Sequence, residues 1–440
     1  MNPVTKKPGL FYGWWIVAAC FSMAVYTSGV VGWGFTAVFE PIKNEFGWSS
    51  AEVAFSSSLR GMETGLFAPA VGLLVNRFGP KTVIFAGGVF TGLGLILMGH
   101  VDSLFTFYTA SALIALGLSL CSANALQVAV AAWFHRRMSL ALGLMSCGFG
   151  FSGLIIPLAV LIVDKVGWRT GQIYFGIGIF IIILPLSLLI RRRPEDYGLL
   201  PDGDTAPSDA PSDNISEHPV NKAADGDRGI SMMQVLSSRT FWFIAVAMSA
   251  QHLVAGGVST HVMPYLTSIG YSREVAGFVA SGIPIASVLG RFSFGWLGDR
   301  LSNKKLAIFG FAILAIGMLS FAYASGGLLI IGVFLLLFGT GFGGTNTMRA
   351  VLPRAYFGMK SYGTVLGLVM GVGTVGSMVG APLAGYIYDT TGTYQLAWYI
   401  YTGIAALSLL SILLIPSARN PESKTTAAKS VPETAGGAKR

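Results

Sequence analysis

Twelve long apolar stretches constrain the fold of this chain more than any other feature of its sequence. They lie at 12–36, 51–75, 82–99, 105–133, 139–163, 170–190, 241–267, 274–298, 306–324, 327–350, 362–386 and 394–416. A hydrocarbon core about 30 Å thick needs about 20 apolar residues of α-helix to cross it, and each stretch is close to that length. None of them shows the two-residue alternation of a membrane β-barrel strand. The sequence therefore predicts an all-α integral membrane protein with twelve transmembrane helices.

The composition supports a membrane protein and argues against other classes. Only 11% of the residues are charged, whereas about 25% is usual in soluble domains. The net charge of +9 does not indicate nucleic-acid binding, because the basic residues recur in alternate loops and form no single patch. The cysteines Cys20, Cys121 and Cys147 all lie in apolar stretches, so no disulfide framework is expected. The first apolar run, Tyr12 to Phe39, is too long for a signal-peptide core and is predicted to be a retained helix.

A polar segment divides the chain into two halves of six stretches each. Residues 191–240 are rich in Asp, Pro and Ser, which predicts a solvated central loop. We therefore expect an N-terminal six-helix bundle at 1–190 and a C-terminal six-helix bundle at 241–416. Residues 417–440 are polar and are predicted to form a disordered cytoplasmic tail.

The distribution of Lys and Arg in the loops predicts the orientation in the membrane. If the N-terminus is cytoplasmic, the inner side carries Lys6, Lys7, Arg77, Lys81, Arg136, Arg137, Arg191, Arg192, Arg193, Arg300, Lys304, Lys305, Arg354 and Lys360. The outer side then carries only Lys43, Lys165, Arg169 and Arg273. This asymmetry predicts a multi-pass protein of the cytoplasmic (inner) membrane with both termini inside the cell.

The two halves repeat each other at a nearly constant offset. The segment Gly72-Leu-Leu-Val-Asn76-Arg77 with Lys81 recurs in the second half as Gly295-Trp-Leu-Gly-Asp299-Arg300 with Lys304. Pro157-Leu-Ala with Asp164 and Gly167 recurs as Pro382-Leu-Ala with Asp389 and Gly392. Halves duplicated in the same orientation are typical of a transporter whose two bundles rock against each other. The first repeated segment is predicted to be an inner gate motif.

Several motifs carry a resemblance to a known family. The segment Gly72 to Lys81 resembles the loop 2–3 signature of the major facilitator superfamily. Further motifs are similar to those of the monocarboxylate porters and the oxalate/formate exchangers: Tyr12-Gly13-Trp14-Trp15, Trp133-Phe134-His135-Arg136-Arg137 with Leu140 to Leu144, Tyr356-Phe357-Gly358, Gly380 to Gly385, and Tyr388-Asp389 with Gly392. The resemblance covers all twelve stretches. It implies two six-helix bundles around a central cavity, and alternating access to that cavity.

The sequence also departs from that family pattern. Asn76 replaces the usual acidic residue of the first gate motif, so a charge latch at the inner gate would depend on Asp299. The animal porters carry a Lys in the outer part of helix 1 and an Asp one turn before the helix 8 Arg, where this chain has Gly34 and Ser287. The Lys that oxalate exchangers carry in helix 11 has no counterpart in 362–386.

Arg291 is the strongest candidate for a substrate-binding residue. It interrupts the otherwise uncharged run from Val275 to Leu297, eight residues before Asp299. At about 1.5 Å per residue it lies roughly 12 Å inside the helix end, close to the membrane midplane. A charge there costs at least about 2.5 kcal/mol on insertion scales and normally faces a cavity or a partner. A guanidinium can bind both oxygens of a carboxylate, and the alternative is an ion pair with a neighbouring acid.

Other polar side chains are predicted at a similar depth. His252 is a candidate for substrate binding or for carrying a coupled proton, with helix packing as the alternative. Asn124, Gln127 and Asn346 are candidates for hydrogen bonding to the substrate, with interhelical contacts as the alternative for the two asparagines. Arg60 and Glu63 lie three residues apart on one helix face, so they either neutralise each other or serve in coupling, with Glu63 as proton carrier.

Glycines are frequent in 139–163 and 362–386 and are expected to allow close helix packing, as the rocking of two bundles requires.

These features predict a secondary active transporter of small monocarboxylates of the lactate or pyruvate kind. One midplane cation balances one carboxylate, whereas a dianion leaves uncompensated buried charge. Proton symport is expected from the family resemblance alone. The alternative is an anion exchanger of the oxalate/formate type or a transporter of another organic acid. No catalytic cluster, metal-ligand cluster or cofactor motif is visible, so neither an enzyme nor a metalloprotein is expected, and the lipid bilayer and a small organic anion are the expected partners of a functional monomer.

Overall fold

The computed structural model describes residues 11–66, 68–134, 137–197, 199–200, 202, 232–298, 301–357 and 362–416. Within these residues the regular structure is helical and contains no strand. Eleven helical segments are long and apolar enough to cross a membrane. The predicted stretch 51–75 is helical on both sides of residue 67, which lies outside the described residues, as α3 (Ser50–Leu66) and α4 (Ala68–Phe78). The predicted all-α membrane fold is confirmed.

The remaining elements of the first half run from α1 to α10. They are α1 (Tyr12–Thr27), η1 (Ser28–Trp33), α2 (Phe35–Phe46), α5 (Pro80–Met98), α6 (Leu104–Leu120), α7 (Ala123–Ala131), α8 (Met138–Phe151), η2 (Ser152–Leu154), α9 (Ile155–Val166), α10 (Trp168–Leu189) and the short η3 (Glu195–Tyr197). The local sequence explains where several of these helices begin or end. Ser103 and Thr106 form a capping box at the start of α6. Gly47 ends α2 with a left-handed φ of 67°, which glycine adopts without strain.

The second half is built from longer uninterrupted helices. They are α11 (Met232–Leu236), α12 (Arg239–Ser268), α13 (Arg273–Gly298), α14 (Asn303–Ala322), η5 (Ala324–Gly326), α15 (Leu328–Phe357), α16 (Tyr362–Thr391) and α17 (Gln395–Leu413). By contrast, three spans of the first half are irregular: η1 is a π-helical segment, η2 is a 3-10 turn, and Cys121 and Ser122 separate α6 from α7. Non-helical backbone at membrane depth is tolerated where it is buried in protein or lines a cavity.

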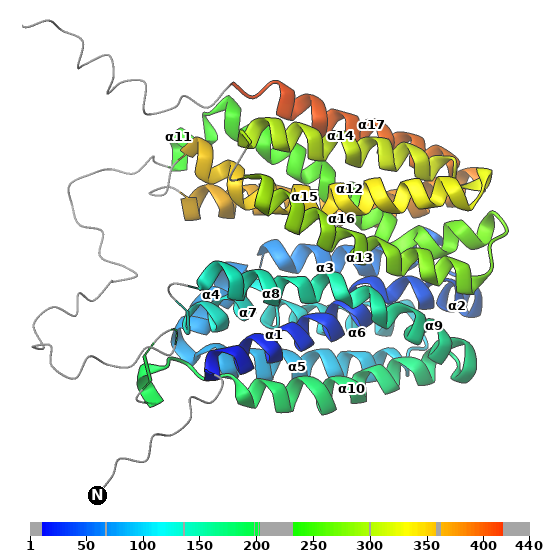
Figure 1. Ribbon diagram of the computed structural model, residues 1–440. Coiled ribbons are helices and arrows are strands. Elements are labelled where there is room, and N and C mark those ends of the chain that lie inside the picture. Colours follow the sequence, from blue (N-terminus) through cyan, green and yellow to red (C-terminus); the bar gives the residue numbers. More distant parts are fainter. Residues whose placement is uncertain are drawn as a thin grey trace, which may run out of the picture.

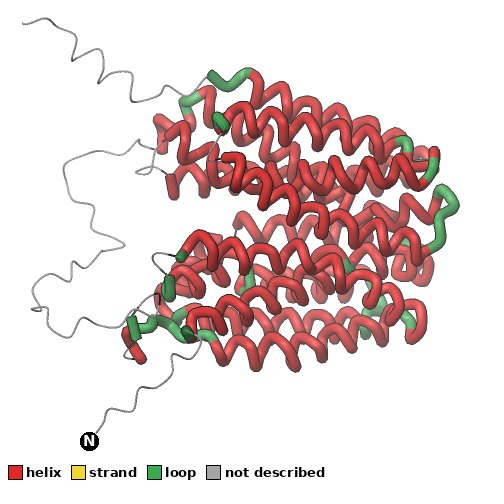
Figure 2. Tube along the Cα trace, in the orientation of Figure 1, coloured by secondary structure: helices red, strands yellow, loops and turns green. Residues whose placement is uncertain are grey.

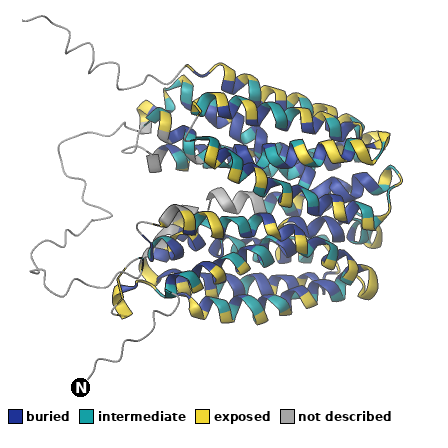
Figure 3. Cartoon of the chain, viewed as in Figure 1, coloured by how far each residue is buried: buried dark blue, intermediate teal, exposed yellow. Residues whose placement is uncertain are grey.

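The helices form two groups that lie side by side (Figure 1). One buried apolar cluster is drawn almost entirely from residues before 191, and the other almost entirely from residues after 234. The tube view shows short connections between successive helices within each group (Figure 2). Buried residues line the interior of each group, and exposed ones lie on its outside (Figure 3). Large apolar side chains such as Phe105, Phe292 and Leu329 are among the most exposed, as expected of a surface that faces lipid.

Contacts between helices join the two groups. α3 packs along α16, and α13 packs against α8, η2 and α9. Glycines allow the second approach: a Cβ added at Gly150 would lie 2.1 Å from Val288 Cγ2, and one at Gly153 would lie 2.3 Å from the carbonyl oxygen of Ser281. Small residues thus bring the backbones of α13 and the 138–154 segment together, as the sequence predicted for these glycines.

Glycines of α16 also pack within the second group, and one of them gives a stability prediction. A Cβ at Gly376 would lie 1.9 Å from the carbonyl oxygen of Ser249, whereas one at Gly371 would meet nothing within 4 Å. Gly376→Ala must therefore push α16 away from α12 and is expected to cost about 1–3 kcal/mol of stability. Gly371→Ala is the matched control on the same helix and should leave stability equal or slightly higher. Thermal unfolding of the purified variants measures both, and equal midpoints for the two would contradict the packing argument.

Candidate functional site

Arg291 lies on α13 where the two groups of helices meet. Its side chain is half-buried. Its Nη1 donates a hydrogen bond to the carbonyl oxygen of Ser146 on α8, at 3.0 Å. No acidic side chain is paired with Arg291 among the described residues. The guanidinium therefore connects the two groups through a neutral backbone carbonyl.

A second arginine near this site was not identified from the sequence. Helix α15 continues past the predicted end at residue 350 to Phe357 and includes Pro353. Arg349 is thus eight residues, or roughly 12 Å, inside that end. It is half-buried, and α15 packs against α13, the helix that carries Arg291. The charge argument for a monoanion, which counted Arg291 alone, therefore left out an arginine that contacts His252.

Arg349 and His252 form a defined pair. Arg349 Nη1 lies 3.2 Å from His252 Nε2, and His252 Nδ1 lies 2.7 Å from the carbonyl oxygen of Met248. A guanidinium has only donors, so Nε2 must accept, and the proton of the imidazole is on Nδ1, which donates to Met248. His252 is accordingly neutral in this arrangement. Gly373 of α16 leaves room beside the ring, since a Cβ there would lie 3.5 Å from Nδ1.

The other predicted polar residues are placed as follows. Asn346 on α15 is half-buried and donates from Nδ2 to the carbonyl oxygen of Phe342 in its own helix, at 2.9 Å. Gln127 is exposed on α7. Asn124 is on α7, and Arg60 and Glu63 are on α3, but their side chains lie outside the described residues. The structure brings Arg291, Arg349 and His252 to one region, and the contacts it gives Asn346 are local.

The predicted inner gate motif is only partly described. Arg77 and Lys81 are exposed near the junction of α4 and α5. Lys304 Nζ donates to the carbonyl oxygen of Ile415 at the end of α17. Gly295 is exposed on α13, and a Cβ there would meet nothing within 4 Å. Asp299 and Arg300 lie outside the described residues, as do the environments of Gly72 and the side chain of Asn76.

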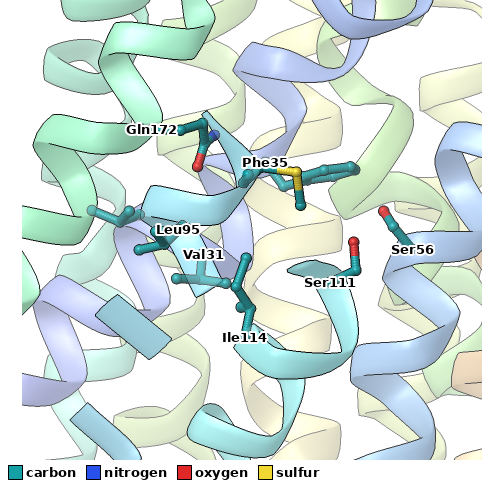
Figure 4. Close-up of a pocket in the computed structure, with 9 residues that line it drawn as sticks. Val31, Phe35, Ser56, Leu95, Ser111, Ile114 and Gln172 are labelled. Atoms are coloured by element: carbon teal, nitrogen blue, oxygen red, sulfur yellow. The ribbon is translucent and has the colours of Figure 1, made fainter. Parts of the chain in front are cut away.

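A cavity of about 220 Å³ lies between the two groups of helices. Four hydroxyl-bearing residues, three glycines or alanines and one leucine line it: Ser57, Ser259, Thr260, Ser377, Gly32, Gly256, Ala381 and Leu118. Each of these lining residues is uncharged. A second cavity, of about 20 Å³, is enclosed within the first group by residues that include Ser56, Ser111 and Gln172 (Figure 4). It is about large enough for one water molecule, so of these two cavities the first has room for a solute.

Polar contacts between the groups gather at the predicted outer end. Asp164 at the end of α9 accepts from Arg273 Nε at 2.9 Å, and Arg273 Nη2 also donates to the carbonyl oxygen of Ala37 at 3.0 Å. Asp389 at the end of α16 accepts the backbone N–H groups of Ser50 and Ala51, at 3.0 and 2.9 Å. The predicted outer end is therefore closed in this structure.

His261 takes part in the same closure. It is fully buried, and its ring contacts Phe39 of the other group with 4.8 Å between centroids. Its Nε2 lies 2.9 Å from the carbonyl oxygen of Ala381 and its Nδ1 lies 3.1 Å from the hydroxyl of Tyr394. Both ring nitrogens thus have partners inside the protein, so His261 is placed to hold the interface.

Neither a disulfide nor a metal-binding cluster is found in the part of the chain that the structure describes. Cys20, Cys121 and Cys147 are free thiols, as the sequence predicted. In the described ranges, no group of three or more His, Cys, Asp or Glu side chains is arranged to hold a metal ion.

Comparison with known proteins places this geometry in context. The family model of the Major Facilitator Superfamily matches residues 14–368 and, in a second match, 262–438. The chain is 27% identical to monocarboxylate transporter 12 of Homo sapiens over 413 residues, which cover 90% of this chain and 79% of that one. It is 28% identical to monocarboxylate transporter 3 of Rattus norvegicus, over 88% of this chain and 76% of that one.

Solved structures show the same fold at low sequence identity. The nucleoside transporter NupG matches with a TM-score of 0.70 and 12% identity, over 91% of this chain and 99% of that one. A bacterial homolog of the human lysosomal transporter Spinster, in an inward-facing and unoccupied conformation, matches with a TM-score of 0.64 and 16% identity, over 93% and 95% of the two chains.

Proposed function

The chain belongs to the major facilitator superfamily, and within it we propose a secondary active transporter of small monocarboxylates, of the lactate and pyruvate kind, that works by alternating access. The family and the similar proteins are transporters, so the chain is a multi-pass membrane transporter and not an enzyme. The proposed substrate class is supported by the names of the relatives and by Arg291.

Arg291 is the observation that carries the proposal. Placing a half-buried guanidinium on a membrane-spanning helix costs free energy. Such a residue therefore normally faces a cavity or a partner and marks a functional site. Here it lies at the junction of the two groups of helices and its described hydrogen bond goes to a neutral carbonyl of the opposite group. A substrate carboxylate offers a charged acceptor, which makes hydrogen bonds roughly twice as strong as a neutral one does. Substrate binding would therefore replace the Ser146 contact. Because that contact joins the two bundles, its loss would couple substrate binding to the movement of one bundle relative to the other.

We take the closed end as the outer side of a cytoplasmic membrane, with both termini inside the cell, and the transporter as a functional monomer. The substrate would then reach Arg291 from the inner side in this conformation and from the outer side after the bundles rock. Proton coupling is part of the proposal, with Glu63, Arg60 and His252 as the candidate residues. His252 takes a proton only after Arg349 moves away, because Nε2 accepts from Arg349 in this conformation.

Arg349 favours a second candidate function, anion exchange of the oxalate/formate type. The charge argument for a monoanion counted one cation, and two guanidiniums lie in this region. Charge balance alone therefore no longer separates monoanions from dianions. The substrate preference has to come from transport measurements.

Uptake into proteoliposomes tests the function and its coupling. We expect saturable uptake of labelled lactate or pyruvate that rises when the inside is made alkaline relative to the outside. An exchanger would instead need preloaded anion and would prefer oxalate over lactate. If Glu63 carries the proton, Glu63→Gln should remove the dependence of uptake on the pH gradient. An unchanged pH dependence in that variant would rule out this role for Glu63, and no uptake of any organic acid would rule out the proposed function.

A further inference from the structure

The cavity between the groups of helices lies close to the His252–Arg349 pair. Gly256 lies four residues beyond His252 on α12, and Ser377 lies four residues beyond Gly373 on α16. Residues four apart share one helix face and are about 6 Å apart along the axis. The cavity therefore begins about one helical turn further toward the closed end, on the two helices that hold His252 and the glycine beside it.

Three hydroxyl groups of this cavity donate hydrogen bonds to other groups of the protein. Ser377 Oγ donates to the carbonyl oxygen of Thr374 at 2.8 Å, and Ser259 Oγ donates to that of Gly256 at 3.1 Å. Thr260 Oγ1 donates to Ser57 Oγ at 3.2 Å. A hydroxyl has one donor and two acceptor lone pairs, so these groups present acceptors to the cavity. The polar part of the wall thus suits a solute that donates hydrogen bonds, and it opposes a second carboxylate.

Small residues create the space for such a group. Gly32, Gly256 and Ala381 line the cavity beside the hydroxyls. A volume of about 220 Å³ exceeds the needs of one or two water molecules. Arg349 beside His252 at one end and hydrogen-bond acceptors about one turn away divide the region into an anion end and a donor-accepting end.

We propose that the cavity lined by Ser57, Ser259, Thr260 and Ser377 binds the tail of the substrate, and that the preferred substrates are carboxylates whose far end carries a hydroxyl or amine donor. This inference rests on the proposed function, since it assumes that the carboxylate binds at the arginines. Among monocarboxylates it ranks those with a polar, hydrogen-bond-donating tail above those with an apolar tail.

Competition between matched acids tests this inference on the full-length protein in proteoliposomes. We measure how well butyrate and 4-hydroxybutyrate, and valerate and 5-hydroxyvalerate, inhibit uptake of labelled lactate. Each hydroxy acid is expected to inhibit about three- to ten-fold more strongly than its parent, which is the gain from one net hydrogen bond. Succinate and glutarate, with a carboxylate in place of the terminal hydroxymethyl group of the matching hydroxy acid, should be weaker inhibitors than the hydroxy acids.

Two serine variants show whether the cavity is responsible. Ser377→Ala removes one acceptor from the wall, and it should reduce the advantage of the hydroxy acids over their parents by at least half. Ser411→Ala is the matched control, because Ser411 donates to its own helix in the same way, at 2.9 Å from the carbonyl oxygen of Leu407, but lies on α17 and not in the cavity wall. In this control, the ratio of the inhibition by each hydroxy acid to the inhibition by its parent acid should equal the wild-type ratio.

The outcomes separate this inference from the proposed function. If parent and hydroxy acids inhibit equally, or if succinate inhibits more strongly than 4-hydroxybutyrate, the inference is wrong while carboxylate transport stands. If Ser377→Ala and Ser411→Ala change the ratio equally, the cavity does not bind the tail. If no acid is taken up or inhibits, the proposed function itself fails, and the inference fails with it.

Discussion

Arg291→Ala is expected to abolish uptake of organic acids while the protein still reaches the membrane. Arg291 is proposed to hold the substrate carboxylate with two charge-assisted hydrogen bonds, each worth about 1.5–3 kcal/mol. Losing both corresponds to at least roughly a hundred-fold loss of binding, because each factor of ten corresponds to about 1.4 kcal/mol. The same substitution removes the hydrogen bond from Nη1 to Ser146 across the bundles. Initial uptake rates at several substrate concentrations, normalised to protein in the membrane, measure the loss.

Two further variants separate substrate binding from general damage. Arg291→Lys keeps the charge but loses the planar fork, so it should retain a weakened, higher-KM uptake. Lys305→Ala removes an exposed cation at the start of α14 and should leave uptake unchanged. Wild-type uptake by Arg291→Ala would contradict the proposal that Arg291 binds the substrate carboxylate. Loss of the protein from the membrane would instead show that Arg291 acts through folding.

The membrane fold could be predicted because its signal is local. Each span needs about 20 apolar residues, and a window of the sequence is enough to find them. The ends of the spans were less certain, and α15 shows the consequence. The predicted span stopped at 350, close to Pro353, whereas a proline is tolerated inside a membrane helix when neighbouring groups satisfy the freed carbonyl. The helix continues to Phe357, so Arg349 lies within α15 and not at its end.

Of the candidate site, only the depth of each residue along its own helix could be predicted from the sequence. Depth placed Arg291 and His252 at one level, but the partner of each depends on how helices distant in sequence pack. The carbonyl of Ser146 and the guanidinium of Arg349 are such partners, 145 and 97 residues away in sequence. The cavity has the same origin, since its wall combines residues from both halves of the chain. A further sequence signal was present in the repeated Asp164 and Asp389, whose role depends on contacts between the halves.

Asp164 and Asp389 form two equivalent latches at the outer end. They occupy equivalent positions in the two repeated halves, and each reaches the first residues of a helix in the other group: Asp164 binds Arg273 at the start of α13, and Asp389 binds Ser50 and Ala51 at the start of α3. Those two helices also begin at equivalent places in the two halves. The first N–H groups of a helix have no partner within it, so the Asp389 carboxylate stabilises those of α3 and the positive end of its helix dipole, whereas Asp164 forms an ion pair with the Arg273 side chain. Both latches break when the outer end opens, so each stabilises the outer-closed conformation alone.

Asp164→Ala and Asp389→Ala combined are therefore expected to shift the conformational equilibrium toward the outward-open form. Loss of a helix cap costs about 0.5–2 kcal/mol, and an exposed ion pair adds up to about 1 kcal/mol. A sum of about 0.5–3 kcal/mol corresponds to roughly a two- to hundred-fold change in the ratio of the two conformations. A reporter thiol below the latches, Ser377→Cys in a Cys147→Ser background, should react correspondingly faster with a membrane-impermeant reagent added outside. Asp102→Ala is the control, because Asp102 lies in the α5–α6 connection and its side chain bonds to nearby Ser103 and Thr106. Equal labelling rates in the double variant and this control would show that the two aspartates do not hold the outer end closed.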